Sequence, residues 1–261
     1  MKKIFGFWIL IVCLLFVSAK TEDIYKVIKV VGSIEVIKTG KELQRGDTFK
    51  ENTLLKFNSP ESKATVINSK KGRFVIARNS ESKSKNNLIP AINNVASRNG
   101  AVLTIIDLKN LFEGKLFVLH ERKIKIALKD YKVDKNCFFY IQYKFKGESV
   151  NKPLPSNKDS LIVNLEKLLI VDGKPIKAPD DTHASIWYLD KDRKGHLLSN
   201  FELIIANEKE LKEEVNVLLT ELEGETNSKK IDEVYSYINE FYGKFDKEEI
   251  SNWLWKSFKL K

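Results

Sequence analysis

The hydrophobic pattern changes its period along the chain, and the change separates a β-rich body from a helical end. From Ile24 to Arg78, short runs of alternating apolar and polar residues are separated by Gly, Asn, Ser and Pro, which predicts strands joined by turns. The stretch "YKVIKVVGSIEVIKTG" alternates, pauses at Gly32-Ser33 and then alternates again. We therefore expect a small β-module over residues 20–78.

A second β-rich unit is predicted over residues 101–206. Its expected strands are "KLFVL", "RKIKIAL", "CFFYIQYKF", "SLIVN", "LLIV", "ASIWYLD" and "LLSNFELIIA". Seven short strands at this spacing favour an antiparallel β-sandwich. Before them, "DLKNLFEG" predicts a short helix with Asp107 as its N-cap and Gly114 just past its end. The dipeptides at natural hairpin positions are Gly147-Glu148 and Asp172-Gly173.

The segment between the two β-rich units is polar. Residues 79–100, "NSESKSKNNLIPAINNVASRNG", are rich in Ser and Asn and have few apolar anchors. We interpret them as a linker or long loop, in which "LIPAINNVA" can still attach to a neighbouring surface.

Residues 207–261 have the 3.6-residue period of amphipathic helices. The apolar positions of the first two helices are Leu211, Val215, Leu218, Leu219 and Leu222, then Ile231, Val234, Tyr235, Ile238, Phe241 and Tyr242. We expect "NSKK" and Gly243 to separate the helices, and Asp246 to cap a third one. Short helices need a surface on which to bury their apolar stripes, so this segment should pack on the β-sandwich. The predicted fold class is α+β, mainly β.

The first residues predict export from the cytoplasm. "MKKIFGFWILIVCLLFVSAK" combines two lysines, an apolar run and small residues, the order found in a secretory signal peptide, with cleavage after Ala19. A retained anchor is the alternative, although the run is shorter than the roughly 20 residues that span a bilayer. Cys13 lies inside the apolar run after Val12, which disfavours a lipoprotein. After cleavage one cysteine remains, Cys137, and its apolar surroundings predict a core residue.

The order of short motifs in residues 24–78 resembles the small β-domain of FecR-like envelope proteins. That domain combines a G-x-(I/V)-x-V strand, a turn of the form gk.L..GD.f and a hairpin of the form L.F.S....A.V. The matching residues here are Gly32, Ile34, Val36, Gly40, Lys41, Leu43, Gly46, Asp47, Phe49, Leu55, Phe57, Ser59, Ala64 and Val66. The resemblance implies a β-module of the cell envelope, periplasmic or envelope-associated, and leaves the rest of the chain unassigned.

The tripeptide Arg45-Gly46-Asp47 matches a cell-adhesion motif, but its setting indicates a turn. It lies between Leu43 and Phe49, where a reversing chain needs a residue that tolerates positive φ and a side chain that bonds its own backbone. We therefore predict a structural role for it.

The charge of the chain is unevenly distributed. Of the net +10, the tail 207–261 carries −4, with nine Lys against thirteen Asp or Glu, and residues 20–206 carry +12. Only six of the 45 basic residues are Arg, whereas phosphate recognition favours the guanidinium fork. The charge is therefore typical of a solvated lysine-rich surface, or of attraction to an anionic envelope polymer or lipid head groups, rather than of nucleic-acid binding.

No motif in the sequence predicts catalysis. The histidines are His120, His183 and His196, and none has metal-ligand spacing. Asp180, Asp181 and His183 lie together in "APDDTHAS", which we interpret as a solvated turn. We predict no catalytic residue, cofactor or metal. The alternative is a hydrolase with a non-local site, formed by scattered carboxylates such as Glu113 and Glu148.

Aromatic residues are the candidates for partner binding. Trp187 and Tyr188 are neighbours on a predicted strand, so they face opposite sides and one of them can be exposed. Trp253 and Trp255 diverge by about 200° on a helix, so one of them, with Phe258 nearby, can face a partner or a membrane interface. Core packing is the alternative for each residue.

These observations favour an exported, non-enzymatic envelope protein that binds or scaffolds another envelope component, either a protein or an anionic polymer. The alternatives are an enzyme with a non-local site and an envelope sensor or regulator that docks a membrane partner.

Overall fold

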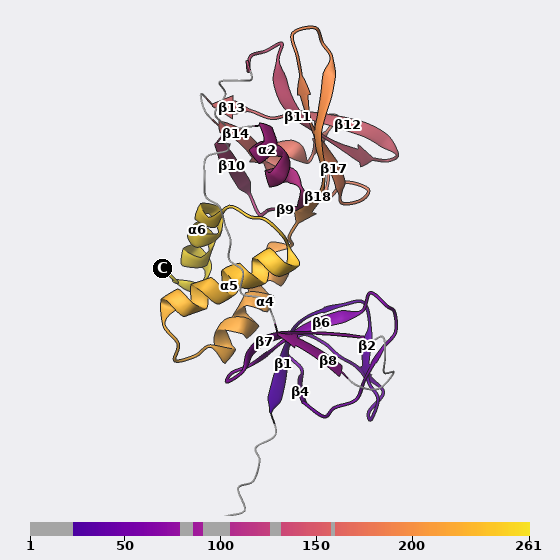
Figure 1. Cartoon of the computed structure of the whole chain (residues 1–261), viewed down its shortest axis with the longest axis vertical. Coiled ribbons are helices and arrows are strands. Elements are labelled where there is room, and N and C mark those ends of the chain that lie inside the picture. Colours follow the sequence, from indigo (N-terminus) through magenta and orange to yellow (C-terminus); the bar gives the residue numbers. More distant parts are fainter. Residues whose placement is uncertain (1–22, 79–85, 91–104, 126–131, 158–159) are drawn as a thin grey trace, which may run out of the picture. The chain divides into compact units, whose positions relative to one another are not determined.

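The computed structural model describes residues 23–78, 86–90, 105–125, 132–157 and 160–261, and Figure 1 shows their elements in sequence colours. Of the described residues, 42% lie in strands and 25% in helices, so the predicted α+β, mainly β class is confirmed. The chain forms two compact units, Met1–Pro90 and Ala91–Lys261. The predicted signal peptide, residues 1–19, lies outside the described residues.

The first unit consists of two antiparallel sheets that enclose a hydrophobic core. The sheet orders are β4-β1-β6-β7-β8 and β3-β2-β5. The strands are β1 (Ile24–Val31), β2 (Ile34–Val36), β3 (Lys41–Glu42), β4 (Thr48–Lys50), β5 (Leu55–Phe57), β6 (Lys63–Asn68), β7 (Gly72–Arg78) and β8 (Asn86–Pro90). The two sheets meet around Tyr25, Val27, Ile34, Leu43, Phe49, Leu55, Ala64, Val66 and Ile76.

The Arg45-Gly46-Asp47 tripeptide forms the predicted turn. Gly46 has a φ of +86°, which favours glycine. The Asp47 carboxylate accepts a 2.9 Å hydrogen bond from the Gln44 amide, and the Asp47 amide donates to the Gln44 carbonyl at 3.1 Å. The side chain and the backbone of Asp47 together close the turn.

The predicted linker or long loop over residues 79–100 includes a strand at residues 86–90, where loop structure was expected. These residues form β8, which pairs antiparallel with β7 from Arg78↔Asn86 to Phe74↔Pro90. Leu88 packs against the core of the first unit, so one apolar anchor in a polar segment is enough to add an edge strand.

The second unit is built on a five-stranded sheet of order β12-β11-β17-β18-β9. A three-stranded sheet, β10-β14-β13, and a two-stranded sheet, β15-β16, complete it. The elements are α2 (Ile105–Phe112), β9 (Gly114–Val118), β10 (Glu121–Lys125), β11 (Phe138–Phe145), β12 (Glu148–Pro153), β13 (Ser156–Asn157), β14 (Ser160–Asn164), α3 (Leu165–Leu168), β15 (Ile170–Val171), β16 (Lys174–Pro175), β17 (His183–Leu189) and β18 (Gly195–Ile205).

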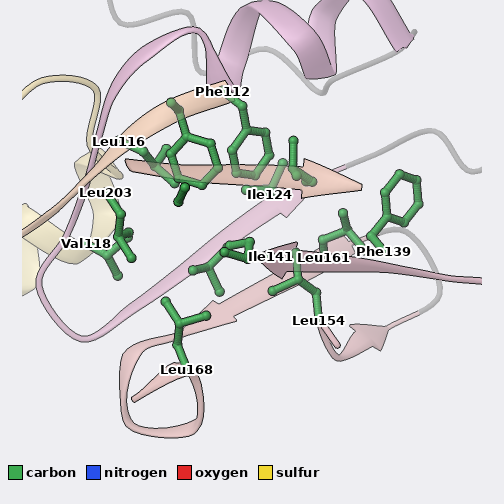
Figure 2. Packing of buried hydrophobic residues seen from close by; sticks show 14 of the residues in the cluster. Phe112, Leu116, Val118, Ile124, Phe139, Ile141, Leu154, Leu161, Leu168 and Leu203 are labelled. Atoms are coloured by element: carbon green, nitrogen blue, oxygen red, sulfur yellow. The ribbon is translucent and has the colours of Figure 1, made fainter. Parts of the chain in front are cut away.

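The core of this unit lies between the five-stranded and three-stranded sheets, and α2 and α3 each add apolar side chains to it (Figure 2). Its buried residues include Phe112, Leu116, Val118, Ile124, Phe139, Ile141, Leu154, Leu161, Leu168 and Leu203. Cys137 is 4% exposed, which confirms its prediction as a buried residue.

Three local predictions in this unit need correction. The helix α2 begins at Ile105, so Asp107 lies in its first turn instead of capping it. The run "LLIV" divides between α3 and β15, because a short apolar run does not distinguish helix from strand. The strand β9 pairs parallel with β18, so the five-stranded sheet is mixed instead of fully antiparallel.

The two predicted hairpins are present, one of them shifted by a residue. Asp172 and Gly173 both have positive φ and join β15 to β16 as expected. The β11–β12 turn uses Lys146 and Gly147, one position before the predicted Gly147-Glu148. Positive φ at both central residues matches the right-handed twist of the flanking strands.

The tail forms three helices, α4 (Glu208–Glu221), α5 (Asn227–Phe241) and α6 (Lys247–Phe258). Asp246 caps α6 as predicted, since its carboxylate accepts from the amides of Glu248 and Glu249. The predicted separator "NSKK" is wrong, because these four residues form the first turn of α5. The Thr226 hydroxyl caps that helix by accepting from the Lys229 amide at 3.3 Å.

A short extended segment after α5 attaches the tail to the five-stranded sheet. Lys244 forms a parallel bridge to Leu116 of β9. Its carbonyl accepts from the Phe117 amide at 2.8 Å, and its amide donates to the Lys115 carbonyl at 2.9 Å. The rings of Phe117 and Tyr242 lie 5.2 Å apart. The expected docking of the tail on the β-rich body is therefore confirmed.

Two charged side chains, the half-buried Glu249 and the buried Arg122, reinforce this attachment. Glu249 Oε1 accepts from the Glu121 amide at 3.0 Å and from the His120 amide. Burial raises the pKa of the Glu249 carboxyl. Arg122 Nη1 donates to the Lys244 carbonyl at 2.7 Å, and burial lowers the pKa of this guanidinium to about 10.

At Gly243 the backbone of the tail packs closely against β9. A Cβ at Gly243, where φ is +95°, would lie 2.3 Å from the Lys115 Cβ and 2.6 Å from its carbonyl oxygen. Gly224 has a φ of +90°, and a Cβ placed there would have no other atom within 4 Å. Gly224→Ala therefore measures only the free-energy cost of positive φ for a residue with a side chain. We expect Gly224→Ala to lower the free energy of unfolding by about 1 kcal/mol and Gly243→Ala by about 3 kcal/mol or more in urea titrations. Equal losses would contradict the close packing.

Glu249 should make stability depend on pH. Because its pKa is raised in the folded state, the folded chain holds this proton more tightly than the unfolded chain. Its contribution to stability is therefore present below the ordinary pKa of 4.5 and is lost as the pH rises through the raised value. We expect Glu249→Gln to gain stability relative to the native chain as the pH increases above 4.5 in urea titrations. The opposite trend would show that the amides of residues 120 and 121 stabilise the carboxylate more than burial destabilises it.

Candidate binding face

The five-stranded sheet has two chemically different faces. Along β11, Phe139, Ile141 and Tyr143 are buried in the core, while Tyr140 and Gln142 point to the other side and are partly exposed. Successive side chains of a strand alternate between faces, so the neighbouring strands follow the same division. We call the side turned away from the core the outer face.

The first row of side chains across the outer face is apolar. Strand register places Pro153, Tyr140, Trp187 and Leu197 side by side on β12, β11, β17 and β18. The rings of Tyr140 and Trp187 are nearly parallel, with 9° between their planes and 6.2 Å between their centroids. Phe138 meets the edge of Tyr140 at 6.3 Å, and Leu197 is 46% exposed. We call Pro153, Tyr140, Trp187 and Leu197 the aromatic row.

Local contacts hold the two rings of the aromatic row in place. Trp187 Nε1 donates a 2.8 Å hydrogen bond to Ser185 Oγ. Gly195 lies beside both rings, and a Cβ there would be 3.0 Å from the Tyr140 hydroxyl. Burial raises the pKa of Tyr140, so its hydroxyl stays protonated at neutral pH and can donate a hydrogen bond.

The second row is polar and uncharged. Asn151, Gln142, Ser185 and Asn200 are in register across the same four strands. Gln142 Nε2 donates to Asn151 Oδ1 at 2.9 Å. Asn151 and Asn200 are exposed. We call these four residues the amide row, because three of them carry carboxamides that both donate and accept hydrogen bonds.

The amide row and the charged row next to it line an open hollow of about 640 Å³. The amide row contributes Gln142, Ser185 and Asn200, and the charged row contributes Lys144, Ser149, His183 and Glu202. His183 and Glu202 pair across β17 and β18, and Lys144 pairs with Ser149 across β11 and β12. The outer face therefore runs from an apolar row through an uncharged polar row to a charged one.

The hollow also has a pair of groups capable of acid–base chemistry. His183 Nδ1 lies 3.3 Å from Asp181 Oδ1, and the two side chains are 83% and 51% exposed. Asp180 is held elsewhere, because its carboxylate accepts from the amides of Lys146 and Gly147, and these bonds lower its pKa. Within the described residues, no group of three or more His, Cys, Asp and Glu side chains is placed to hold a metal ion.

The aromatic residues predicted from the sequence are separated by the structure. Trp187 belongs to the aromatic row, whereas Tyr188 points to the core, 5.0 Å from the Phe139 ring, and donates to the Lys132 carbonyl. Sequence reasoning missed Tyr140, because "CFFYIQYKF" is apolar on both faces and its exposed side follows only from the pairing of β11.

The tail tryptophans diverge as predicted. Trp253 is 4% exposed and packs against Phe258, with their ring centroids 5.6 Å apart. Trp255 is 49% exposed, and Lys259 Nζ lies 5.6 Å from its ring centroid. Trp255 is therefore the surface aromatic of α6. None of the helices in the described part of the chain combines the length and the apolarity that a membrane span requires.

The neighbours Trp187 and Tyr188 provide a direct test of the two faces. Tyr188→Ala removes a ring that packs on the core, so we expect a loss of about 2 to 3 kcal/mol in the free energy of unfolding. Trp187→Ala removes a ring contact on the outer face, for which we expect about 1 kcal/mol. Urea titrations of both variants give the comparison. A larger loss for Trp187→Ala would contradict the assignment of the faces.

Comparison with known proteins assigns no family to this chain. No family model matches it, and neither does any curated protein or any solved structure. The resemblance of residues 24–78 to FecR-like domains therefore stays a prediction, and the geometry of the outer face is the basis for a functional proposal.

Proposed function

We propose that this chain is an exported, non-enzymatic protein of the cell envelope that binds another envelope component through the outer face of its five-stranded sheet. The observation that supports this most is the aromatic row beside the amide row. Apolar contact area next to a few precisely placed polar groups is the composition of recognition sites in general.

The way these rows are held favours binding. Tyr140 and Trp187 lie on adjacent strands, packed against each other, so little conformational freedom is lost when a partner contacts them. The hydrogen bond from Trp187 to Ser185 restricts the indole further. A surface on rigid strands is also more precise than one on loops.

Export and envelope location rest on the sequence. The order of charged, apolar and small residues in positions 1–19 supports a secretory signal. The FecR-like motifs of residues 24–78 support an envelope β-module, which we propose as a separate unit joined to the binding unit.

An enzyme is the second candidate, and the Asp181–His183 pair is the observation that favours it. A carboxylate that orients a histidine is a common acid–base arrangement. The high exposure of both side chains weighs against it, because water screens the interaction between them. A sensor that docks a membrane partner through Trp255 is a third candidate, supported by the exposure of that ring.

The proposal is tested by retention on envelope material. The purified chain should be retained on washed, protein-containing envelope fragments and crosslink to them, whereas Trp187→Ala should lose about tenfold in retention. Trp255→Ala is the matched control, because it removes an exposed tryptophan from another surface, and it should bind like the native chain. Equal retention of all three proteins would exclude the outer face, and loss only with Trp255→Ala would favour the docking alternative.

A further inference from the structure

We infer that the outer face binds an uncharged oligosaccharide, laid across strands β12, β11, β17 and β18 with its sugar rings on the aromatic row and its hydroxyl groups on the amide row. This inference rests on the proposed function and specifies its ligand. It differs from the anionic polymer that the overall charge of the chain suggests.

The aromatic row provides the surface on which sugar rings can stack. The face of an aromatic ring carries negative charge density, which attracts the weakly polarised C–H groups on one side of a sugar ring. Tyr140 and Trp187 stack with 9° between their ring planes, so they form one rigid aromatic cluster on two adjacent strands. Gly195 keeps the space beside the two rings free of a side chain.

The amide row matches the chemistry of sugar hydroxyl groups. A hydroxyl both donates and accepts, and so do the carboxamides of Asn151, Gln142 and Asn200. Ser185, which lies between them, is buried, and its hydroxyl accepts from the Trp187 indole. The bond from Gln142 to Asn151 uses one amide hydrogen and one carbonyl oxygen, which leaves further donor and acceptor positions on both side chains. The aromatic and amide rows are adjacent, so a chain that lies on the rings can reach the amides.

The length of the rows suits an oligomer. Four neighbouring strands at a spacing of about 4.8 Å give rows of roughly 14 Å from β12 to β18. This span exceeds a single sugar ring, so the face is suited to a short chain of sugars.

The charges near the rows cancel, which favours an uncharged ligand over a polyanion. Lys144 in the hollow is balanced by Asp181 and Glu202, while Lys115 lies 4.0 Å from the Glu202 carboxylate. A face that selects a polyanion presents an excess of cations, so that its potential complements the ligand. Two cations, Lys144 and Lys115, thus face two anions, Asp181 and Glu202, at the hollow.

Titration calorimetry with three hexamers tests this inference. The probes are cellohexaose and chitohexaose, which are uncharged, and hexagalacturonate, which has the same number of rings and a carboxylate on each. We expect the purified chain to bind at least one uncharged hexamer more tightly than hexagalacturonate. Its affinity should be unchanged between about 0.05 M and 0.5 M NaCl, because screening acts on charges.

Variants assign the binding to the two rows. Trp187→Ala should weaken binding of the uncharged hexamer about tenfold, and Trp255→Ala should leave it unchanged. Asn200 is exposed, so Asn200→Ala should leave the packing unchanged. We expect it to weaken binding about threefold, and it keeps the test valid if Trp187→Ala unfolds. Ligand-induced change in tryptophan fluorescence should be present in the native chain and reduced in Trp187→Ala.

Three results would overturn the inference. They are tighter binding of hexagalacturonate that is lost at high salt, no binding of either uncharged hexamer at millimolar concentration, or binding that neither Trp187→Ala nor Asn200→Ala changes.

If envelope retention depends on Trp187 while no hexamer binds, the outer face still binds a partner and only the ligand class is wrong. If the hexamers bind but Trp187→Ala does not change retention on envelope fragments, the inference on the ligand stands and the envelope role is wrong.

Discussion

The antiparallel ladder between β11 and β17 is the constraint on which the core and the proposed binding face both depend. Its register runs without a break from Phe138↔Leu189 to Tyr143↔Ala184. The alternation that buries Phe139 also turns its neighbours to the outer face. A slip of one residue would exchange the two faces of the strand and place the core side chains in water. The free energy of core burial therefore fixes which residues form the aromatic and amide rows, and the hydrogen bond from Trp187 to Ser185 then restricts the indole.

A second requirement is that the edge of the sheet at β9 be paired. β9 is held on one side by its parallel ladder with β18 and on the other by the bridge to Lys244. An unpaired edge strand is a template for aggregation, so the tail covers a surface that the sheet needs to have covered. Gly243 permits the close approach, and the side chains of Arg122 and Glu249 bond to backbone atoms at the same place. The tail is thus part of the second unit, and its apolar stripes complete the fold of that unit.

The net charge of the β-rich body and the local charges of the outer face suggest different ligands. The lysine-rich body has a net positive charge, which affects solubility and general attraction to anionic surfaces. The outer face, by contrast, carries an uncharged polar row and a balanced set of ionic groups. Specific recognition depends on the groups that touch the ligand, because charges separated by more than about 10 Å are screened in physiological salt. The local chemistry of the face is therefore the better guide to what it binds.

The sequence by itself determined the features that depend on neighbouring residues: the mainly β class, the turn at Gly46, the cap at Asp246 and the divergence of Trp253 from Trp255. Each follows from backbone preference or from the period of one helix or strand. Trp187 was foreseen as a candidate, but its partners Tyr140 and Gln142 were not. The tertiary structure alone decided the strand β8, the parallel pairing of β9 and the alignment of β11 with β17. These depend on contacts between segments far apart in the chain, and only the packing of the whole core sets their register.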